Sequence, residues 1–273
     1  MPMVASYHTH FDDYLNYYHL PFLQKWIWKY MLWFHRSFQR VYVPSQSTKD
    51  KLVDLKFHPD LEIWGRGIDH SYFHPERRTN SVRETYRIKQ KNILLYVGRI
   101  APEKEIDLAL RTFHSLPSSI KDETHFLLVG DGPQLKMLSQ YSNEQVTFTG
   151  FKEGDELADI YASSDLFLFP SSTETFGNVV LEAMASGLPV IGANAGGVQH
   201  LIQHGETGFL CEPKDQESFT RLTGRLLQSG YKRSAFSVRA REYALSYSWE
   251  EIFSDLVNSY NEIMIRNQKR HSA

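Results

Sequence analysis

Short apolar runs alternate with amphipathic stretches along almost the whole chain, and this alternation limits the possible folds more than any other feature. Runs such as VYVPS, NILLYVG and DLFLFPS have the length and the aromatic and β-branched content of buried strands. The stretches between them are typical of helices. Strands that alternate with helices predict parallel sheets of the doubly wound α/β class, in which ligands bind beyond the carboxyl ends of the strands.

A polar, charged segment divides the alternation into two unequal parts. Residues 1–70 contain the end of one strand–helix domain, residues 71–90 are typical of a linker, and residues 91–248 contain a complete second domain. We expect the chain to close with helices over residues 215–229 and 249–273, the last of which returns to the first domain. The predicted fold is therefore two doubly wound parallel-sheet domains, of which the first is incomplete.

The composition argues against several classes of protein. The chain carries 30 Lys and Arg against 32 Asp and Glu, whereas a general nucleic-acid binder normally has a basic excess. Cys211 is the only cysteine, so one chain forms neither an internal disulfide nor a cysteine-based zinc site. The start resembles no secretory signal, and no run of about 20 apolar residues predicts a spanning helix. We therefore expect a cytoplasmic protein.

Two cations follow the first strand of the second domain and indicate a phosphate site. Arg99 comes directly after NILLYVG, and Lys104 lies five residues later in GRIAPEKE. A guanidinium offers a planar fork to phosphate oxygens, and an ammonium offers a mobile point charge. Taken by themselves, however, two charges after a strand are more often simply solvated.

The stretch TETFGNVVLEAMASGLPVIG strengthens the phosphate hypothesis. We expect a helix to begin near Phe176 or Gly177, where unpaired backbone N–H groups and the helix dipole favour an anion. Glycine at position 177 lets a ligand approach the backbone closely. The alternative is an ordinary capped helix start with no ligand.

Two glutamates flank this helix start. Glu174 precedes the helix, and Glu182 lies about one and a half turns inside it. A buried carboxylate needs partners because unpaired burial is costly. Sugar hydroxyls would serve, and a salt bridge from Glu182 to a neighbouring helix is an equally weighted alternative. VGDGP lacks the full Gly-x-Gly-x-x-Gly fingerprint, which argues against a nicotinamide-dependent dehydrogenase.

Together these motifs resemble the retaining glycosyltransferases of family 4, which have the GT-B fold of two facing Rossmann-like domains. SSTETFGNVVLEAMASGLPVIGANAGGV with GETGFL resembles the family's Glu-x7-Glu signature, and YVGRIAPEK, LLVGDGP and VTFTGF occur in the family's order. GIDHSYFHP resembles the family's entry to the interdomain linker. The first domain would bind the acceptor and the second the donor. Judged by the usual size of a domain, the resemblance also implies that about 100 residues of the first domain are missing from this sequence.

The resemblance implies a reaction and the residues that perform it. A sugar would move from a nucleoside-diphosphate sugar, GDP-mannose or a UDP-sugar, to a hydroxyl acceptor with retention, without a metal or other cofactor. Arg99 and Lys104 would hold the diphosphate. Glu174 would contact the transferred sugar and Glu182 the ribose, while His8 would reach toward the reaction centre from the first domain. The remaining donor-binding residues would be Gly130, Phe151 near the base, Phe176, Gly177, Asn178 and Val179.

Two alternatives to a transferase stay open. The chain could be a module that only binds nucleotide sugars, or a sugar epimerase of the same fold. His200 stands where many family members have a glutamate, so it receives no role. A metal site at His8, His10, Asp12 and Asp13 is conceivable, but the spacing fixes no clear third ligand.

The segment over residues 22–40 is predicted to be one helix that contains no acidic residue. A basic stripe would lie on one side, and an apolar back would pack in the core. Tryptophan beside basic residues is typical of a helix on an anionic membrane, while a helix buried on two sides is the alternative. We favour peripheral membrane contact, as in the lipid-glycosylating mannosyl- and sulfoquinovosyl-transferase branch that the chain most resembles. The stripe consists of Lys25, Lys29, Arg36 and Arg40, with Trp28, Leu32 and Trp33 beside it, and the back of Phe22, Leu23, Trp26, Ile27, Tyr30, Phe34 and Phe38.

Overall fold

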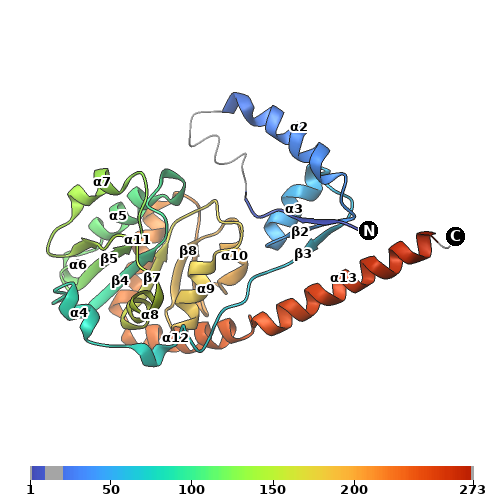
Figure 1. Ribbon diagram of the computed structural model, residues 1–273. Coiled ribbons are helices and arrows are strands. Elements are labelled where there is room, and N and C mark those ends of the chain that lie inside the picture. The colour runs from blue at the N-terminus through green and yellow to red at the C-terminus, as the bar shows by residue number, and fades with distance from the viewer. Residues whose placement is uncertain (1, 10–20, 272–273) are drawn as a thin grey trace.

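Two parallel sheets, one small and one large, organise the chain (Figure 1). The computed structural model describes residues 2–9 and 21–271. The small sheet has the order β1-β2-β3, with β1 at Val4–Ser6, β2 at Arg40–Val43 and β3 at Leu61–Ile63. Both of its strand pairs are parallel, as are all five pairs in the large sheet. The predicted α/β class with two parallel sheets is confirmed.

The large sheet has the order β6-β5-β4-β7-β8-β9. Its central strands are buried along their whole length, which explains why they are continuous apolar runs rather than alternating patterns. Chain order leads outward in one direction from β4 and in the other from β7, so these neighbours form a topological switch point. The strands are β4 Asn92–Val97, β5 Thr124–Val129, β6 Val146–Phe148, β7 Leu166–Phe169, β8 Val190–Ala193 and β9 Gly208–Cys211.

Helices cover both faces of the large sheet. Because parallel crossovers are right-handed, α5 (Ile106–His114) lies on one face, and α8 (Gly154–Ser163) and α9 (Asn178–Ala185) lie on the other. Helix α11 (Gln216–Gln228) packs against α5. Further helical segments are η1 Pro21–Leu23, α3 Gln46–Asp54, η2 Pro75–Arg77, α4 Ser81–Thr85, η3 Pro102–Lys104, α6 Ser118–Lys121, α7 Leu135–Leu138, η4 Ser139–Tyr141 and α10 Val198–Leu201.

Two helices close the chain. Helix α12, Gly230–Leu245, is absent from the sequence-based assignment, although Phe236, Ala240 and Ala244 recur every four residues and are buried. It packs on α9. Helix α13, Trp249–His271, extends to the small sheet (Figure 1), where Arg40 Nη1 donates a hydrogen bond to Ser259 Oγ at 2.7 Å.

The predicted helix over residues 22–40 is shorter than expected and faces the other way. Helix α2 spans Gln24–His35, and Arg40 instead begins β2, where it is buried and paired with Asp60. Of the residues expected in the core, Phe22, Trp26 and Tyr30 are 69%, 72% and 58% exposed, whereas Leu23, Ile27 and Phe38 are partly buried. The opposite side packs on the first core through Trp28, Met31 and Leu32. Both faces of this helix carry aromatic side chains, so the periodicity of the sequence predicted the wrong face to be buried.

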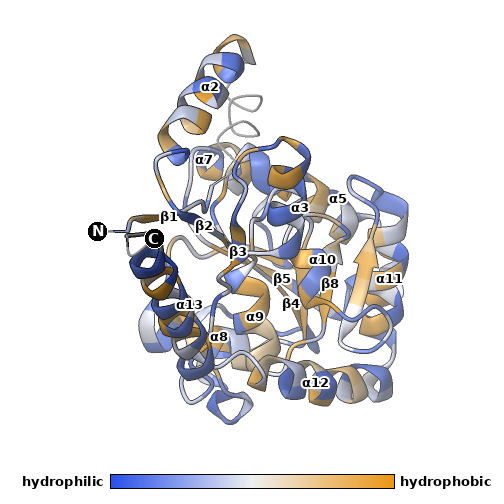
Figure 2. Ribbon diagram, turned by 90° about the vertical axis from the view of Figure 1, so that its right-hand side faces the viewer, coloured by the Kyte–Doolittle hydropathy of each residue, from blue (hydrophilic) through white to orange (hydrophobic). Residues whose placement is uncertain are grey.

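Helix α2 projects beyond the small sheet in two perpendicular views (Figures 1 and 2). Its exposed aromatic side chains therefore lie on an outer surface of the described structure. No helix within residues 2–9 and 21–271 combines the length and the apolar character needed to cross a membrane.

Candidate functional site

Two adjoining cavities lie at the carboxyl ends of β4 and β7, at the switch point of the large sheet. The first has a volume of about 380 Å³ and the second of about 500 Å³. Gly98, Arg99 and Val179 line both, so the cavities form one groove. Every residue predicted to bind the donor or to take part in the reaction lines this groove. The first cavity contains His8, Arg99, Lys104, Glu174, Phe176, Gly177, Asn178 and Val179, and the second contains Gly130, Phe151 and Glu182.

Close packing of two strand-end loops shapes the floor of the groove. Gly130 follows β5 with a φ of +140°, and a Cβ there would lie 1.9 Å from the carbonyl oxygen of Gly98. No other residue fits that contact. Gly130 therefore lets the loops after β4 and β5 approach each other.

The start of helix α9 forms one wall. The helix begins at Asn178, with Gly177 as N-cap at a φ of +105°, within two residues of the expected start. Among the described residues no side chain caps this terminus. Its first backbone N–H groups are thus available to an anion, and the helix dipole favours a negative charge there.

Lys104 and Glu174 form an ion pair in the first cavity. The Lys104 ammonium donates to Glu174 Oε1, and the two side chains are only 12% and 19% exposed. The residue expected to bind phosphate and the residue expected to bind sugar therefore contact each other directly. A ligand that engages either one must compete with the other.

Arg99 has a carboxylate beneath it that sequence reasoning missed. Arg99 Nη1 lies 3.6 Å from Glu103 Oε1, and the Glu103 side chain is buried whereas Arg99 is 54% exposed. Neither carboxylate oxygen of Glu103 has a hydrogen-bond partner within the described chain. The signal was present in GRIAPEK, where Glu103 lies next to Lys104.

Glu182 lies deeper, at the second cavity. Burial raises the pKa of its carboxyl, and a hydrogen bond from Tyr161 opposes that rise. Tyr161 Oη, on α8, donates to Glu182 Oε2 at 2.9 Å. This hydrogen bond, and no salt bridge in the part of the chain that the structure describes, links Glu182 to a neighbouring helix. A buried carboxylate without a cation is a costly arrangement.

His8 brings the first domain to the groove. Thr175 Oγ1 donates to the backbone oxygen of His8 at 3.0 Å and so joins the small sheet to the segment before α9. Burial and the nearby Arg66 guanidinium hold the pKa of the His8 ring below its ordinary value. Arg66 also lines the first cavity, and sequence reasoning gave it no role. Its only signal was its place between the glycines of WGRG.

The metal alternative is not tested by the structure. His10, Asp12 and Asp13 lie outside the described residues. Within residues 2–9 and 21–271 no group of three His, Cys, Asp or Glu side chains is arranged to hold a metal ion.

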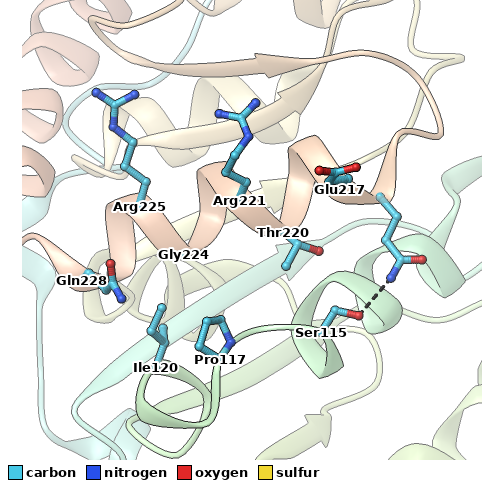
Figure 3. Close-up of a pocket in the computed structure, with 10 residues that line it drawn as sticks. Ser115, Pro117, Ile120, Glu217, Thr220, Arg221, Gly224, Arg225 and Gln228 are labelled. Atoms are coloured by element: carbon cyan, nitrogen blue, oxygen red, sulfur yellow. Dashed lines mark hydrogen bonds between the residues drawn. The ribbon is translucent and has the colours of Figure 1, made fainter.

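A larger hollow of about 690 Å³ lies elsewhere, between α11 and the connection from α5 to α6 (Figure 3). Thr220 and Gly224 come from α11, and Pro117 and Ile120 come from the opposite side. None of the predicted site residues lines it. Size alone does not identify the candidate site, whereas position at the strand ends does.

The family models match both parts of the chain. The model described as glycosyl transferases group 1 matches residues 78–243, and the model described as Glycosyltransferase Family 4 matches residues 1–72. The first match alone covers more than half of the chain.

Curated proteins from plants and bacteria are similar over nearly the whole chain. A sulfoquinovosyl transferase of Arabidopsis thaliana is 34% identical over 282 residues, which cover 99% of this chain and 54% of that protein. A GDP-mannose-dependent alpha-mannosyltransferase of Corynebacterium glutamicum is 32% identical, with 98% and 63% covered. The chain thus spans less than two thirds of the length of these relatives.

The fold is also found in solved structures. The Anabaena protein HepE in complex with UDP-glucose superposes with a TM-score of 0.83 at 21% identity, covering 96% of this chain and 72% of that one. The likeness identifies the architecture as the GT-B fold of two facing α/β domains, as predicted.

Proposed function

The chain belongs to the glycosyl transferases group 1, and from this premise we propose that it transfers a sugar from a nucleoside-diphosphate sugar to a hydroxyl acceptor, with retention of the anomeric configuration. One observation carries the proposal. Arg99, Lys104, Glu174 and the uncapped start of α9 meet in one groove at the switch point of the donor domain. That combination suits a diphosphate joined to a sugar.

The cations would act mainly on the leaving group. Negative charge grows on the diphosphate as the bond from its oxygen to the anomeric carbon breaks. Arg99, Lys104 and the backbone N–H groups at the start of α9 are arranged to stabilise that charge. In this proposal the leaving phosphate itself accepts the proton of the acceptor hydroxyl, and no side chain near it is required as a base.

The ion pair gives Glu174 and Lys104 a shared role. When phosphate oxygens bind the Lys104 ammonium, the Glu174 carboxylate is released to accept hydrogen bonds from hydroxyls of the transferred sugar. Because Lys104 and Glu174 are largely buried, this exchange takes place away from bulk water. Donor binding would thus place Lys104 at the diphosphate and Glu174 at the sugar, on the two sides of the bond that breaks.

The second cavity would bind the nucleoside. Glu182 would accept hydrogen bonds from the ribose hydroxyls, and Phe151, which is 66% exposed, would lie beside the base. His8, at the first-domain side, would contact the sugar near the reacting carbon. GDP-mannose and UDP-sugars are the proposed donors, in line with the names of the relatives.

We further propose that α2 contacts an anionic membrane and that the acceptor is a lipid at the inner, cytoplasmic face. Phe22, Trp26, Tyr30 and Trp33 are all more than half exposed. The helix carries Lys25 and Lys29 and no acidic residue. An exposed aromatic surface with basic neighbours is typical of interfacial helices.

A ligand panel tests the central proposal. Nucleoside diphosphates and nucleotide sugars are added to the protein while thermal unfolding is followed. A ligand present at 100 times its dissociation constant adds about 2.7 kcal/mol to the free energy of unfolding. Stabilisation by one nucleoside diphosphate, and release of free sugar from its nucleotide sugar, would support a transferase. Stabilisation without any turnover would favour a binding module, and no stabilisation by any nucleotide would contradict the proposal.

A further inference from the structure

Arg66 is the cation of the groove that no carboxylate neutralises in the described part of the chain. Of the three cations that line the first cavity, Lys104 pairs with Glu174, and Arg99 lies near Glu103. Arg66 pairs with no acidic side chain among residues 2–9 and 21–271. It comes from the loop after β3, and therefore from the opposite domain to the other two cations.

The neighbours of Arg66 bind its guanidinium without balancing its charge. Arg66 Nη2 lies 3.0 Å from Nδ1 and 3.2 Å from Nε2 of His8, whose ring pKa is held below its ordinary value by burial and by Arg66 itself. The guanidinium carbon lies 4.7 Å from the centre of the Trp64 ring, in a cation–π contact. Burial also lowers the pKa of Arg66. A half-buried cation without a counterion is costly, so this arrangement suits an anion supplied by a ligand.

The backbone around Arg66 is fixed in place. The N–H of Trp64 donates to the Val43 oxygen at 2.8 Å, and a Cβ on Gly67 would lie 2.6 Å from the backbone nitrogen of Trp249. Packing this close requires glycine at position 67. The segment is therefore held against the first sheet on one side and the start of α13 on the other, which pre-positions the Arg66 side chain.

We propose that Arg66 binds an oxyanion of the substrate, a phosphate, sulfonate or carboxylate group, at the first-domain side of the groove. The inference rests on the proposed function, in which the groove holds a nucleotide sugar. A guanidinium presents two parallel N–H donors to such a group and binds it in a fixed orientation. The oxyanion has two possible sources: the donor diphosphate itself, or a separate anionic group on the transferred sugar or on the acceptor.

Calorimetry on four proteins separates these sources. They are the wild type, Arg66→Gln, Arg66→Lys and the control Arg239→Gln, whose arginine is exposed on α12 outside the groove. If Arg66 binds the diphosphate, Arg66→Gln weakens nucleoside-diphosphate binding about tenfold or more, which corresponds to about 1.4 kcal/mol. If it binds a separate group, nucleotide affinity is unchanged, but inorganic sulfate binds the nucleotide-saturated wild type and not Arg66→Gln. Arg66→Lys, which keeps the charge and loses the fork, should give an intermediate affinity.

Equal nucleotide and sulfate binding by wild type, Arg66→Gln and Arg239→Gln would overturn the inference, with circular dichroism used to verify folding. If Arg66→Gln does not fold, Arg66→Lys against wild type supplies the same comparison. If the wild type binds no nucleoside diphosphate, the proposed function fails. Sulfate and pyrophosphate, titrated alone into wild type and Arg66→Gln, then still test Arg66 by itself.

Discussion

The two halves of the groove differ in how their charges are held. In the first cavity, a cation and a carboxylate of the second domain, Lys104 and Glu174, already pair with each other. In the second, Val97, Val129 and Leu157 line the cavity beside the buried carboxylate of Glu182, whose hydrogen-bond partner among the described residues is Tyr161. Ligand binding in the first half must exchange existing ion pairs, whereas the second half is preformed. This difference is consistent with the proposal that the reaction takes place in the first cavity and that the nucleoside is recognised in the second.

The largest expected effect tests the reacting end. Glu174→Gln should reduce turnover of the nucleotide sugar by about 10²–10³-fold, as the loss of one well-placed polar group in an active site does. It should leave affinity for the free nucleoside diphosphate unchanged or tighter, because Lys104 is then released from its partner. Steady-state kinetics and calorimetry measure the two quantities. Weaker binding of the free nucleoside diphosphate by Glu174→Gln would contradict the proposal that Glu174 contacts the transferred sugar and not the nucleotide.

Arg99 tests the grip on the diphosphate. Arg99→Ala should weaken nucleoside-diphosphate binding by about 1.5–3 kcal/mol, the range for a hydrogen bond to a charged group. Arg111→Ala is a suitable control, because Arg111 pairs with Asp107 on the outer side of α5 and does not line the groove. Equal affinities for the two variants, measured by calorimetry on folded protein, would contradict a phosphate role for Arg99.

Substitution of Glu182 tests the second cavity through ligand affinity and through the free energy of unfolding. Glu182→Gln should weaken the free nucleotide and the nucleotide sugar alike, by about 1.5 kcal/mol for a lost charged hydrogen bond. Its carboxyl has a raised pKa in the folded state, so the folded protein binds the proton more tightly than the unfolded chain does. The stability contributed by this group therefore falls as pH rises from about 4.5 through the folded pKa.

The variant should consequently be more stable than the wild type at pH 7, and this gain should shrink toward pH 4. Thermal unfolding of the unliganded proteins across that range is the measurement. A gain in stability that is independent of pH would mean that burial of the Glu182 charge does not destabilise the folded protein. Glu182 would then be a residue that supports the structure of α9.

The smallest effect concerns α2, which lies outside the groove. Replacing Lys25 and Lys29 with glutamine should weaken binding to anionic vesicles by about 1 kcal/mol per residue and leave nucleotide affinity unchanged. Binding by the wild type should fall as salt is added, because exposed charges are screened. Co-sedimentation measures both. Equal sedimentation with neutral vesicles would argue against an anionic membrane as the partner.

The sequence by itself determined the parallel sheets and the position of the groove. Buried central strands such as β4 are continuous apolar runs, and their order with helices fixes where their carboxyl ends meet. It also identified Arg99, which directly follows a predicted strand, and the start of α9, which the sequence around Gly177 indicates. These features depend on neighbours along the chain.

Only the tertiary structure decided which charges meet. Lys104 pairs with Glu174 across 70 residues, and Arg66 reaches His8 across 58, and neither spacing follows a local period. The same holds for the orientation of α2. Both faces of this helix carry aromatic side chains, so the periodicity of the sequence does not indicate which face is buried. Side-chain pairing between loops depends on how sheets and helices pack in three dimensions. That packing, rather than local pattern, set the ion pairs of the groove and left Arg66 without an acidic partner among residues 2–9 and 21–271.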